Sequence, residues 1–130
     1  MSEQNTHTIE KIGGTSMSDY QSVRNNIVLG GTRKTLFQRV FVVSAYSGIT
    51  NQLLEHKKTG QPGVYELFAN GMEDSGWIQK FEELTQELYS INGDLFIEGP
   101  LLVKANKFLN ERLTDAKQCL LDLQSLCQHG

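Results

Sequence analysis

Two short segments of the sequence carry residues whose types and spacing could bind a phosphorylated substrate. The first joins one cation, two glycines and two hydroxyls, namely Lys11, Gly13, Gly14, Thr15 and Ser16. Glycines let backbone N–H groups approach an anion because no Cβ intervenes. The lysine ammonium and the two hydroxyls are further donors to phosphate oxygens, and the positive end of a following helix adds to them. Together they predict a cradle for the β- and γ-phosphates of a nucleotide.

The second segment places four hydroxyls and one amide within eight residues, from Ser44 to Asn51. These groups directly follow an apolar run and could hold a small polar substrate through hydrogen bonds, with Ser44 and Thr50 as candidate substrate-binding residues. A nucleophilic serine is disfavoured because the segment lacks the Gly-x-Ser-x-Gly pattern and no histidine is placed as its base.

Each segment taken alone also has a plainer interpretation. The first could be a glycine turn beside a surface lysine, and it is neither a P-loop nor a dinucleotide fingerprint because both glycine patterns are absent. In the second, Ser47 or Thr50 could simply cap a helix.

Both segments follow an expected strand and precede an expected helix. Residues 8–12 partly alternate between apolar and polar and stop at the glycines. Residues 40–43 are a continuous run of β-branched and aromatic side chains, which is typical of a parallel strand covered on both faces. The order strand, helix, strand therefore predicts a parallel pair.

The chain between these strands predicts one amphipathic helix. Apolar residues recur at steps of 3, 3 and 4, at Met17, Tyr20, Val23 and Ile27. Ser16 with Asp19 has the spacing of a capping box. Ser18 with Gln21 has the same spacing, and a glycine pair at 30–31 ends the helix.

The remainder of the chain reads as helical. Short helices are expected after residue 49, with two lysines at 57–58 near the end, and over 64–69. A helix buried on one side includes residues 77–88, and residues 91–94 interrupt it. A long helix runs from about Pro100 to Cys127, with an apolar stripe at Leu102, Ala105, Leu109, Leu113, Ala116, Leu120, Leu123 and Cys127.

These elements predict an α/β protein with a short parallel sheet and a mostly helical C-terminal half. In open α/β sheets, ligands bind beyond the carboxyl ends of the strands. The two polar segments should therefore lie side by side at that edge. Because few further strands are expected, residues 1–130 should be the beginning of a larger α/β domain.

Composition excludes several classes of partner. The chain has 130 residues, and twelve basic against fifteen acidic residues give a net charge of −3. A slightly acidic chain has no overall attraction for nucleic acid or anionic lipid. No stretch has the roughly 18 apolar residues of a membrane span, and residues 1–8 are polar, unlike a signal peptide. We therefore expect no nucleic-acid partner and no membrane partner.

The cysteines and histidines indicate a reducing compartment and no protein metal site. Cys119 and Cys127 would lie roughly 12 Å apart along the long helix, which is too far for a disulfide. The three histidines are scattered and never reach zinc-ligand spacing. We therefore expect free thiols and a cytoplasmic protein.

Together the two segments resemble the opening of an aspartate kinase of the amino-acid kinase family. Residues 11–17 read Lys-Ile-Gly-Gly-Thr-Ser-Met, similar to the family's Lys-Phe-Gly-Gly-Thr-Ser. Residues 42–51 read Val-Val-Ser-Ala-Tyr-Ser-Gly-Ile-Thr-Asn, similar to its Val-Val-Ser-Ala-x-Ser-Gly-x-Thr-Asn. The Thr-Ser and Thr-Asn pairs favour aspartate kinases over relatives that act on glutamate, acetylglutamate or UMP. The opening is also similar to that of kinases associated with ectoine synthesis.

The resemblance implies transfer of the ATP γ-phosphoryl group to the side-chain carboxylate of L-aspartate, giving 4-phospho-L-aspartate for amino-acid biosynthesis. Lys11 would neutralise the transferring group, and residues 13–16 would donate to the phosphates, with Mg²⁺ bridging phosphate oxygens. Ser44 and Thr50 would lie on the aspartate side. The implied fold is the N-terminal part of an amino-acid-kinase αβα sandwich.

The sequence also departs from the family. Glu10 stands where an apolar strand residue is common; either its covering elements are missing or it pairs with a cation. Nothing after Asn51 matches the further substrate and nucleotide motifs, and we expect no regulatory domain within residues 1–130. The first hypothesis is therefore half of an aspartate kinase active site, inactive alone, in a homo-oligomer formed through the long helix. The alternatives are a non-catalytic helical interaction module, another amino-acid kinase, and a complete small kinase.

Overall fold

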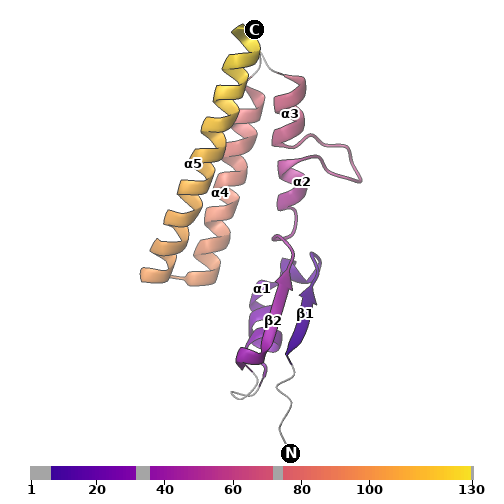
Figure 1. The fold of residues 1–130 in the computed structure, drawn as a ribbon, viewed down its shortest axis with the longest axis vertical. Coiled ribbons are helices and arrows are strands. Elements are labelled where there is room, and N and C mark those ends of the chain that lie inside the picture. The colour runs from indigo at the N-terminus through magenta and orange to yellow at the C-terminus, as the bar shows by residue number, and fades with distance from the viewer. Residues whose placement is uncertain (1–6, 32–35, 72–74, 130) are drawn as a thin grey trace, which may run out of the picture. The chain divides into compact units, whose positions relative to one another are not determined.

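The computed structural model describes residues 7–31, 36–71 and 75–129. The chain divides into two compact units, residues 1–48 and residues 49–130. The first unit contains the two strands, and the second is helical (Figure 1). The prediction of a short sheet with a mostly helical C-terminal half is confirmed.

The two strands of the first unit pair in parallel. Strand β1 is Thr8–Ile12 and strand β2 is Arg39–Val43, with Thr8 opposite Arg39 and Ile12 opposite Val43. A single-turn 3₁₀ helix, η3 (Leu36–Gln38), leads into β2. Because paired strands that run in the same direction end at the same edge, the segments after Ile12 and Val43 both begin there.

The helix expected between the strands is broken into three pieces. A 3₁₀ turn, η1 (Ser16–Ser18), is followed by a short α-helix, α1 (Tyr20–Val23), and by a π-helical turn, η2 (Arg24–Val28). Asp19 separates the first two pieces: its side chain caps α1 by accepting from the Ser22 N–H at 3.0 Å. Asp19 is thus the N-cap of α1, whereas the predicted capping boxes began at Ser16 and Ser18.

The π turn also changes which side chain reaches the core. The next core position after Val23 is now five residues along the chain instead of four, so Val28 packs inward and Ile27 stays 37% exposed. The prediction of Ile27 as the fourth core position is therefore wrong, and the wider helical turn is the reason.

The core of the first unit lies on one face of the sheet. Ile12, Met17 and Val23 are buried together, with partly buried side chains packed around them at Tyr20, Val28, Phe41 and Tyr46. The other face carries Ile9, Val40 and Val42, which are 76%, 50% and 50% exposed. A strand of this type is expected to be covered on both faces, and the described residues cover one face, through side chains of η1, α1 and η2.

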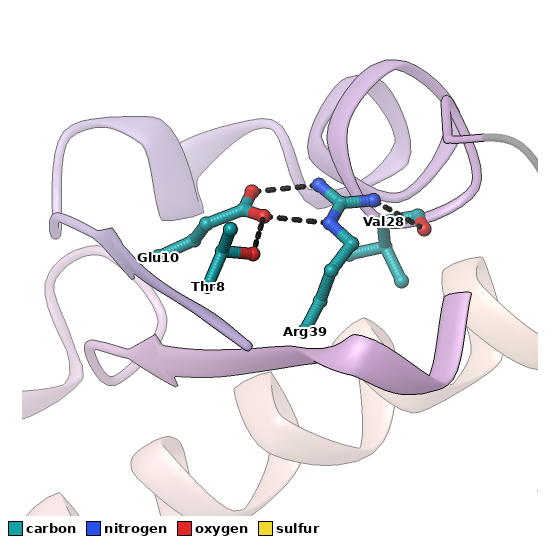
Figure 2. A network of polar contacts seen from close by, with 4 residues as sticks. All are labelled: Thr8, Glu10, Val28 and Arg39. Carbon is teal, nitrogen blue, oxygen red and sulfur yellow. Dashed lines mark hydrogen bonds and ion pairs between the residues drawn. The ribbon is translucent and has the colours of Figure 1, made fainter. Parts of the chain in front are cut away.

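Glu10 lies on the core side of the sheet and pairs with a cation. Figure 2 shows its carboxylate gripped by the Arg39 guanidinium, with Nε and Nη2 each 2.6 Å from a carboxylate oxygen. Thr8 donates to the same carboxylate at 3.2 Å, and Arg39 Nη1 donates to the Val28 carbonyl at 3.4 Å. Two-pronged pairing is geometrically specific, so this network ties β1 and β2 in register and joins both to the end of η2.

The second unit begins with two short helices, α2 (Ile49–Leu53) and α3 (Val64–Asn70). Helix α3 confirms the helix predicted over 64–69. Lys57 and Lys58 fall in a turn beyond α2, so the prediction that they lie near the end of this helix is wrong. That turn is organised by His56, whose Nδ1 accepts from two backbone N–H groups at 3.3 and 3.2 Å.

Two long helices, α4 (Gly76–Phe96) and α5 (Pro100–His129), lie side by side in the second unit (Figure 1). Residues 91–94 continue α4 rather than interrupting it, and the helix ends at Phe96, followed by Ile97 with a φ of +50°. Glycine in a long helix costs only about 1 kcal/mol, which the tertiary packing of α4 on α5 outweighs.

The apolar positions of α4 form the core of the second unit. Trp77, Phe81 and Leu84 are buried, and the Phe68 ring meets Trp77 edge-on at 5.6 Å. On α5, five positions of the predicted stripe are half-buried, namely Leu102, Ala105, Leu109, Leu113 and Leu120. The other three positions, Ala116, Leu123 and Cys127, are exposed, so the stripe packs on α4 over part of its length.

The Glu10–Arg39 pair predicts a pH dependence of stability. The hydrogen bonds from Arg39 hold the pKa of Glu10 below its usual range. A carboxyl with a lowered folded-state pKa stabilises the fold above its unfolded pKa of about 4.3, and this contribution is lost as the pH falls through the lower, folded value. Glu10→Gln should therefore lower the urea midpoint of the first unit at pH 7 and have little effect near pH 2.

The measurement follows the amide NMR signals of β1 and β2 during urea unfolding. Glu98→Gln is the matched control, since Glu98 is exposed. A Glu10→Gln effect that is equally large at both pH values would contradict the assignment.

Candidate functional site

The first polar segment forms a turn between β1 and η1. The Gly13 carbonyl accepts from the Met17 N–H at 3.2 Å, and the Thr15 carbonyl accepts from the Ser18 N–H at 3.3 Å. The N–H groups of Gly14, Thr15 and Ser16 make no hydrogen bond to another described residue. This turn therefore presents three consecutive N–H donors, and the exposed hydroxyls of Thr15 and Ser16 accompany them.

The conformation of this turn does not itself require glycine. Neither Gly13 nor Gly14 has a φ in the left-handed range. A Cβ added to Gly13 would meet nothing within 4 Å, and one added to Gly14 would make only an ordinary contact, with the Ser44 Cβ at 4.0 Å. Internal packing thus leaves both glycines unexplained, whereas close approach of an external group to the backbone would explain them.

The second polar segment starts against the first. The Ser44 N–H donates to the Ile12 carbonyl at 3.0 Å, which extends the strand pairing by one residue. Together with the 4.0 Å between the Ser44 Cβ and an ideal Cβ on Gly14, this bond puts the first residue of the second segment beside the glycine turn. Ser44 is half-buried and Ser47 is exposed.

The structure links Lys11 and Thr50 less closely to the glycine turn and Ser44. Lys11 is exposed, one residue before the end of β1 and opposite Val42. By strand alternation it lies on the sheet face opposite Ile12, beside the uncovered apolar residues. Thr50 is exposed in α2, which belongs to the second unit. Within the first unit the structure therefore brings together the glycine turn and Ser44.

The helix that follows the glycine turn contributes little electrostatically. The predicted cradle included the positive end of a helix dipole, but η1 has three residues. A dipole needs several aligned peptide units to approach half a charge. The turn N–H groups themselves, rather than a macrodipole, are the donors that this site offers to an anion.

The described residues hold no group of three or more His, Cys, Asp or Glu side chains arranged to bind a metal. Asp19, three residues after Ser16, uses both carboxylate oxygens to accept from Ser22, at 3.0 Å from its N–H and 2.7 Å from its hydroxyl. These hydrogen bonds lower the pKa of Asp19 below its usual range. None of the helices in residues 7–31, 36–71 and 75–129 has the length and apolarity to cross a bilayer.

The second unit has an open groove of about 540 Å³ between α4 and α5. Its polar side chains already pair with one another: Lys117 donates to Glu82 at 2.9 Å, and the Tyr89 hydroxyl donates to Asn110 at 3.4 Å. None of the predicted site residues lines this groove. We interpret it as the surface of a helix pair held by polar contacts.

Sequence reasoning missed two interactions that shape the site. The sequence did not identify Arg39 as the partner of Glu10, although the register of the two parallel strands places both side chains on the same face of the sheet. Tyr46 was noted only for its hydroxyl. In the structure its ring meets the Tyr20 ring edge-on, with centroids 6.2 Å apart, and burial raises the pKa of its phenol.

Comparison with known proteins found one clear similarity. The chain is 50% identical over 125 residues to Aspartate kinase Ask_Ect of Stutzerimonas stutzeri (strain A1501). These residues are 95% of this chain and 26% of that protein, so the chain spans about a quarter of the length of the relative it matches. No protein-family model matches the chain, and no solved structure does. The predicted resemblance to an aspartate kinase is confirmed.

The glycines of the two turns should respond differently to alanine. Gly48 has a φ of +87°, so Gly48→Ala should destabilise the chain by about 1–2 kcal/mol. Gly13→Ala should change stability by less than about 0.5 kcal/mol, as is usual for surface substitutions. Urea unfolding of the two variants and the parent chain measures both effects. A Gly13→Ala loss as large as that of Gly48→Ala would show that the first turn needs its glycine for folding.

Proposed function

From this confirmed resemblance to an aspartate kinase, we propose that the chain supplies the phosphate-binding turn and part of the amino-acid site of such an enzyme. The reaction is transfer of the γ-phosphoryl group of ATP to the side-chain carboxylate of L-aspartate, giving 4-phospho-L-aspartate and ADP. Residues 1–130 form a portion of the catalytic domain and need the rest of the enzyme for turnover.

The observation that carries this proposal is the adjacency of two turns with different chemistry. Three N–H donors without a described partner lie in one turn, and an ideal Cβ on Gly14 is 4.0 Å from the Ser44 Cβ of the other. A reaction that joins a phosphoryl group to a carboxylate needs an anion site and an amino-acid site within bonding reach of each other. The 50% identity to an aspartate kinase selects the substrates.

The glycine turn is suited to the triphosphate. N–H groups and hydroxyls donate to phosphate oxygens without carrying charge, and glycine at positions 13 and 14 lets those oxygens approach the backbone. Lys11, two residues before Gly13 in the chain, adds a positive charge. Phosphoryl transfer depends mainly on positioning and on stabilising charge in the transition state, and Lys11 supplies that stabilisation.

The second turn is suited to the amino acid. Ser44 and Thr50 are the side chains assigned to aspartate, and the substrate carboxylate is itself the nucleophile. No protein base is required for its attack, which agrees with a turn rich in neutral hydroxyls. Mg²⁺ would be held through the ATP phosphates and would supply neutralisation of their charge, since the described residues include no group of three or more His, Cys, Asp or Glu side chains that could hold it.

The proposal also includes self-association of the protein and a cytoplasmic location. Exposed apolar side chains on the open sheet face (Ile9, Val40 and Val42) and on α5 (Leu101, Phe108 and Leu126) support self-association. The two exposed free thiols are consistent with a cytoplasmic protein.

Mg-ATP should stabilise the 130-residue chain against heat. A ligand that binds only the folded state stabilises it and so raises the unfolding midpoint. At a ligand concentration one hundred times its Kd, the free energy of unfolding rises by about 2.7 kcal/mol. Gly13→Val is the matched variant, because a Cβ at this position meets nothing within 4 Å, and a branched side chain there should hinder the approach of a phosphate to the backbone. The midpoint should rise for the parent and stay constant for Gly13→Val. An equal response of both proteins would contradict phosphate binding at this turn, and no response would favour the non-catalytic helical module.

Lys11→Ala should lower the kcat of the full-length gene product by at least ~100-fold, as expected for loss of one electrostatic contact to the transition state. The assay measures ADP that forms only when aspartate is present. Lys104→Ala, at an exposed position of α5, is the control and should keep parental turnover. Unchanged kcat in Lys11→Ala would remove this residue from the mechanism.

A further inference from the structure

The second turn depends on a single side chain for its packing into the first unit. Within residues 44–48, all of which the structure describes, Tyr46 is the residue that packs against the buried cluster of Ile12, Met17 and Val23. Ala45, Ser47 and Gly48 are exposed. Two residues before Tyr46, Ser44 is held by the hydrogen bond from its N–H to the Ile12 carbonyl.

Tyr46 also meets the element that follows the first turn. Its ring and that of Tyr20 lie at 89° to each other with centroids 6.2 Å apart, the edge-to-face geometry that aromatic pairs prefer. Tyr20 is the first residue of α1, directly after the Asp19 cap. The aromatic pair therefore links the chain just beyond the glycine turn to the middle of the second turn.

We infer that Tyr46 is a positioning residue: held edge-on by Tyr20, its ring keeps Ser44 against the glycine turn and thereby sets the aspartate side of the site. The inference rests on the proposed function and adds a residue with no assigned role in it. In this inference the aromatic ring of Tyr46 positions Ser44, and its phenol oxygen is not needed.

The two turns are supported by different contacts, so the loss of Tyr46 affects them unequally. The glycine turn keeps its own hydrogen bonds from Met17 and Ser18, and the Glu10–Arg39 pair still fixes the strands. The second turn loses its packing into the core. Aspartate binding should therefore weaken while ATP binding is retained.

The test measures kcat and the two KM values in the full-length gene product. In Tyr46→Leu the KM for aspartate should rise about tenfold or more, whereas the KM for ATP should stay within about twofold, since small misplacement of a binding group is costly. Tyr46→Phe keeps the ring and should match the parent. Tyr65→Leu, at an exposed tyrosine of α3, is the control for tyrosine loss and should also match it.

Equal rises in both KM values, or none, would overturn the inference, as would a Tyr46→Phe variant as impaired as Tyr46→Leu. If the parent makes no ADP with aspartate, the proposed function fails, and NMR of the 130-residue chain then decides the positioning role separately. A contact between the protons of Gly14 and Ser44 should be seen in the parent and in Tyr46→Phe, and lost in Tyr46→Leu. Its persistence in Tyr46→Leu would reject that role.

Discussion

The parallel pairing of β1 with β2 is the constraint on which the rest of the site depends. With Ile12 opposite Val43, both strands end together, and the Ser44 N–H continues the ladder onto Ile12. A shift of one residue in either strand would exchange the two faces of that strand. It would also separate Gly14 from Ser44. The adjacency of the two turns therefore starts from strand register, and the contact between the Tyr46 and Tyr20 rings adds to it.

Several interactions fix that register from one side. The two-pronged Glu10–Arg39 pair spans the strands, and Arg39 also donates to the end of η2. The cluster around Ile12 and Met17 covers the same face. The opposite face has no such support in the described residues and leaves Val40 and Val42 half exposed. A two-stranded sheet is marginal by itself, so this one relies on side-chain contacts on its core face.

The sequence predicted the strands, the parallel pairing and most helices, because each is marked by local periodicity. It also predicted the two turns, because glycines and hydroxyls after an apolar run mark the end of a strand. It did not predict the π turn that replaces Ile27 by Val28, since helical widening depends on tertiary packing. Nor did it predict that α4 runs through Gly93, where packing on α5 outweighs the low propensity of one glycine.

The site was predicted less completely than the fold. Residue types in each turn indicated an anion site and a polar substrate site, and strand order indicated that they are neighbours. The partners Arg39 and Tyr20 lie 29 and 26 residues from Glu10 and Tyr46 in the chain. Such contacts arise from the register of the sheet and the packing of its helices, so no local pattern marks them. The chemistry of the site could therefore be predicted from the sequence, whereas the contacts that support it could not.

The central claim is that the glycine turn and the second turn adjoin, and disulfide trapping tests it most directly. An ideal Cβ on Gly14 lies 4.0 Å from the Ser44 Cβ, within the roughly 3.5–4.5 Å that a disulfide requires. Gly14→Cys with Ser44→Cys, in a chain whose native Cys119 and Cys127 are replaced by serine, should form an intramolecular disulfide under mild oxidation. Two accessible thiols that stay reduced, or that link only between molecules, would contradict the account.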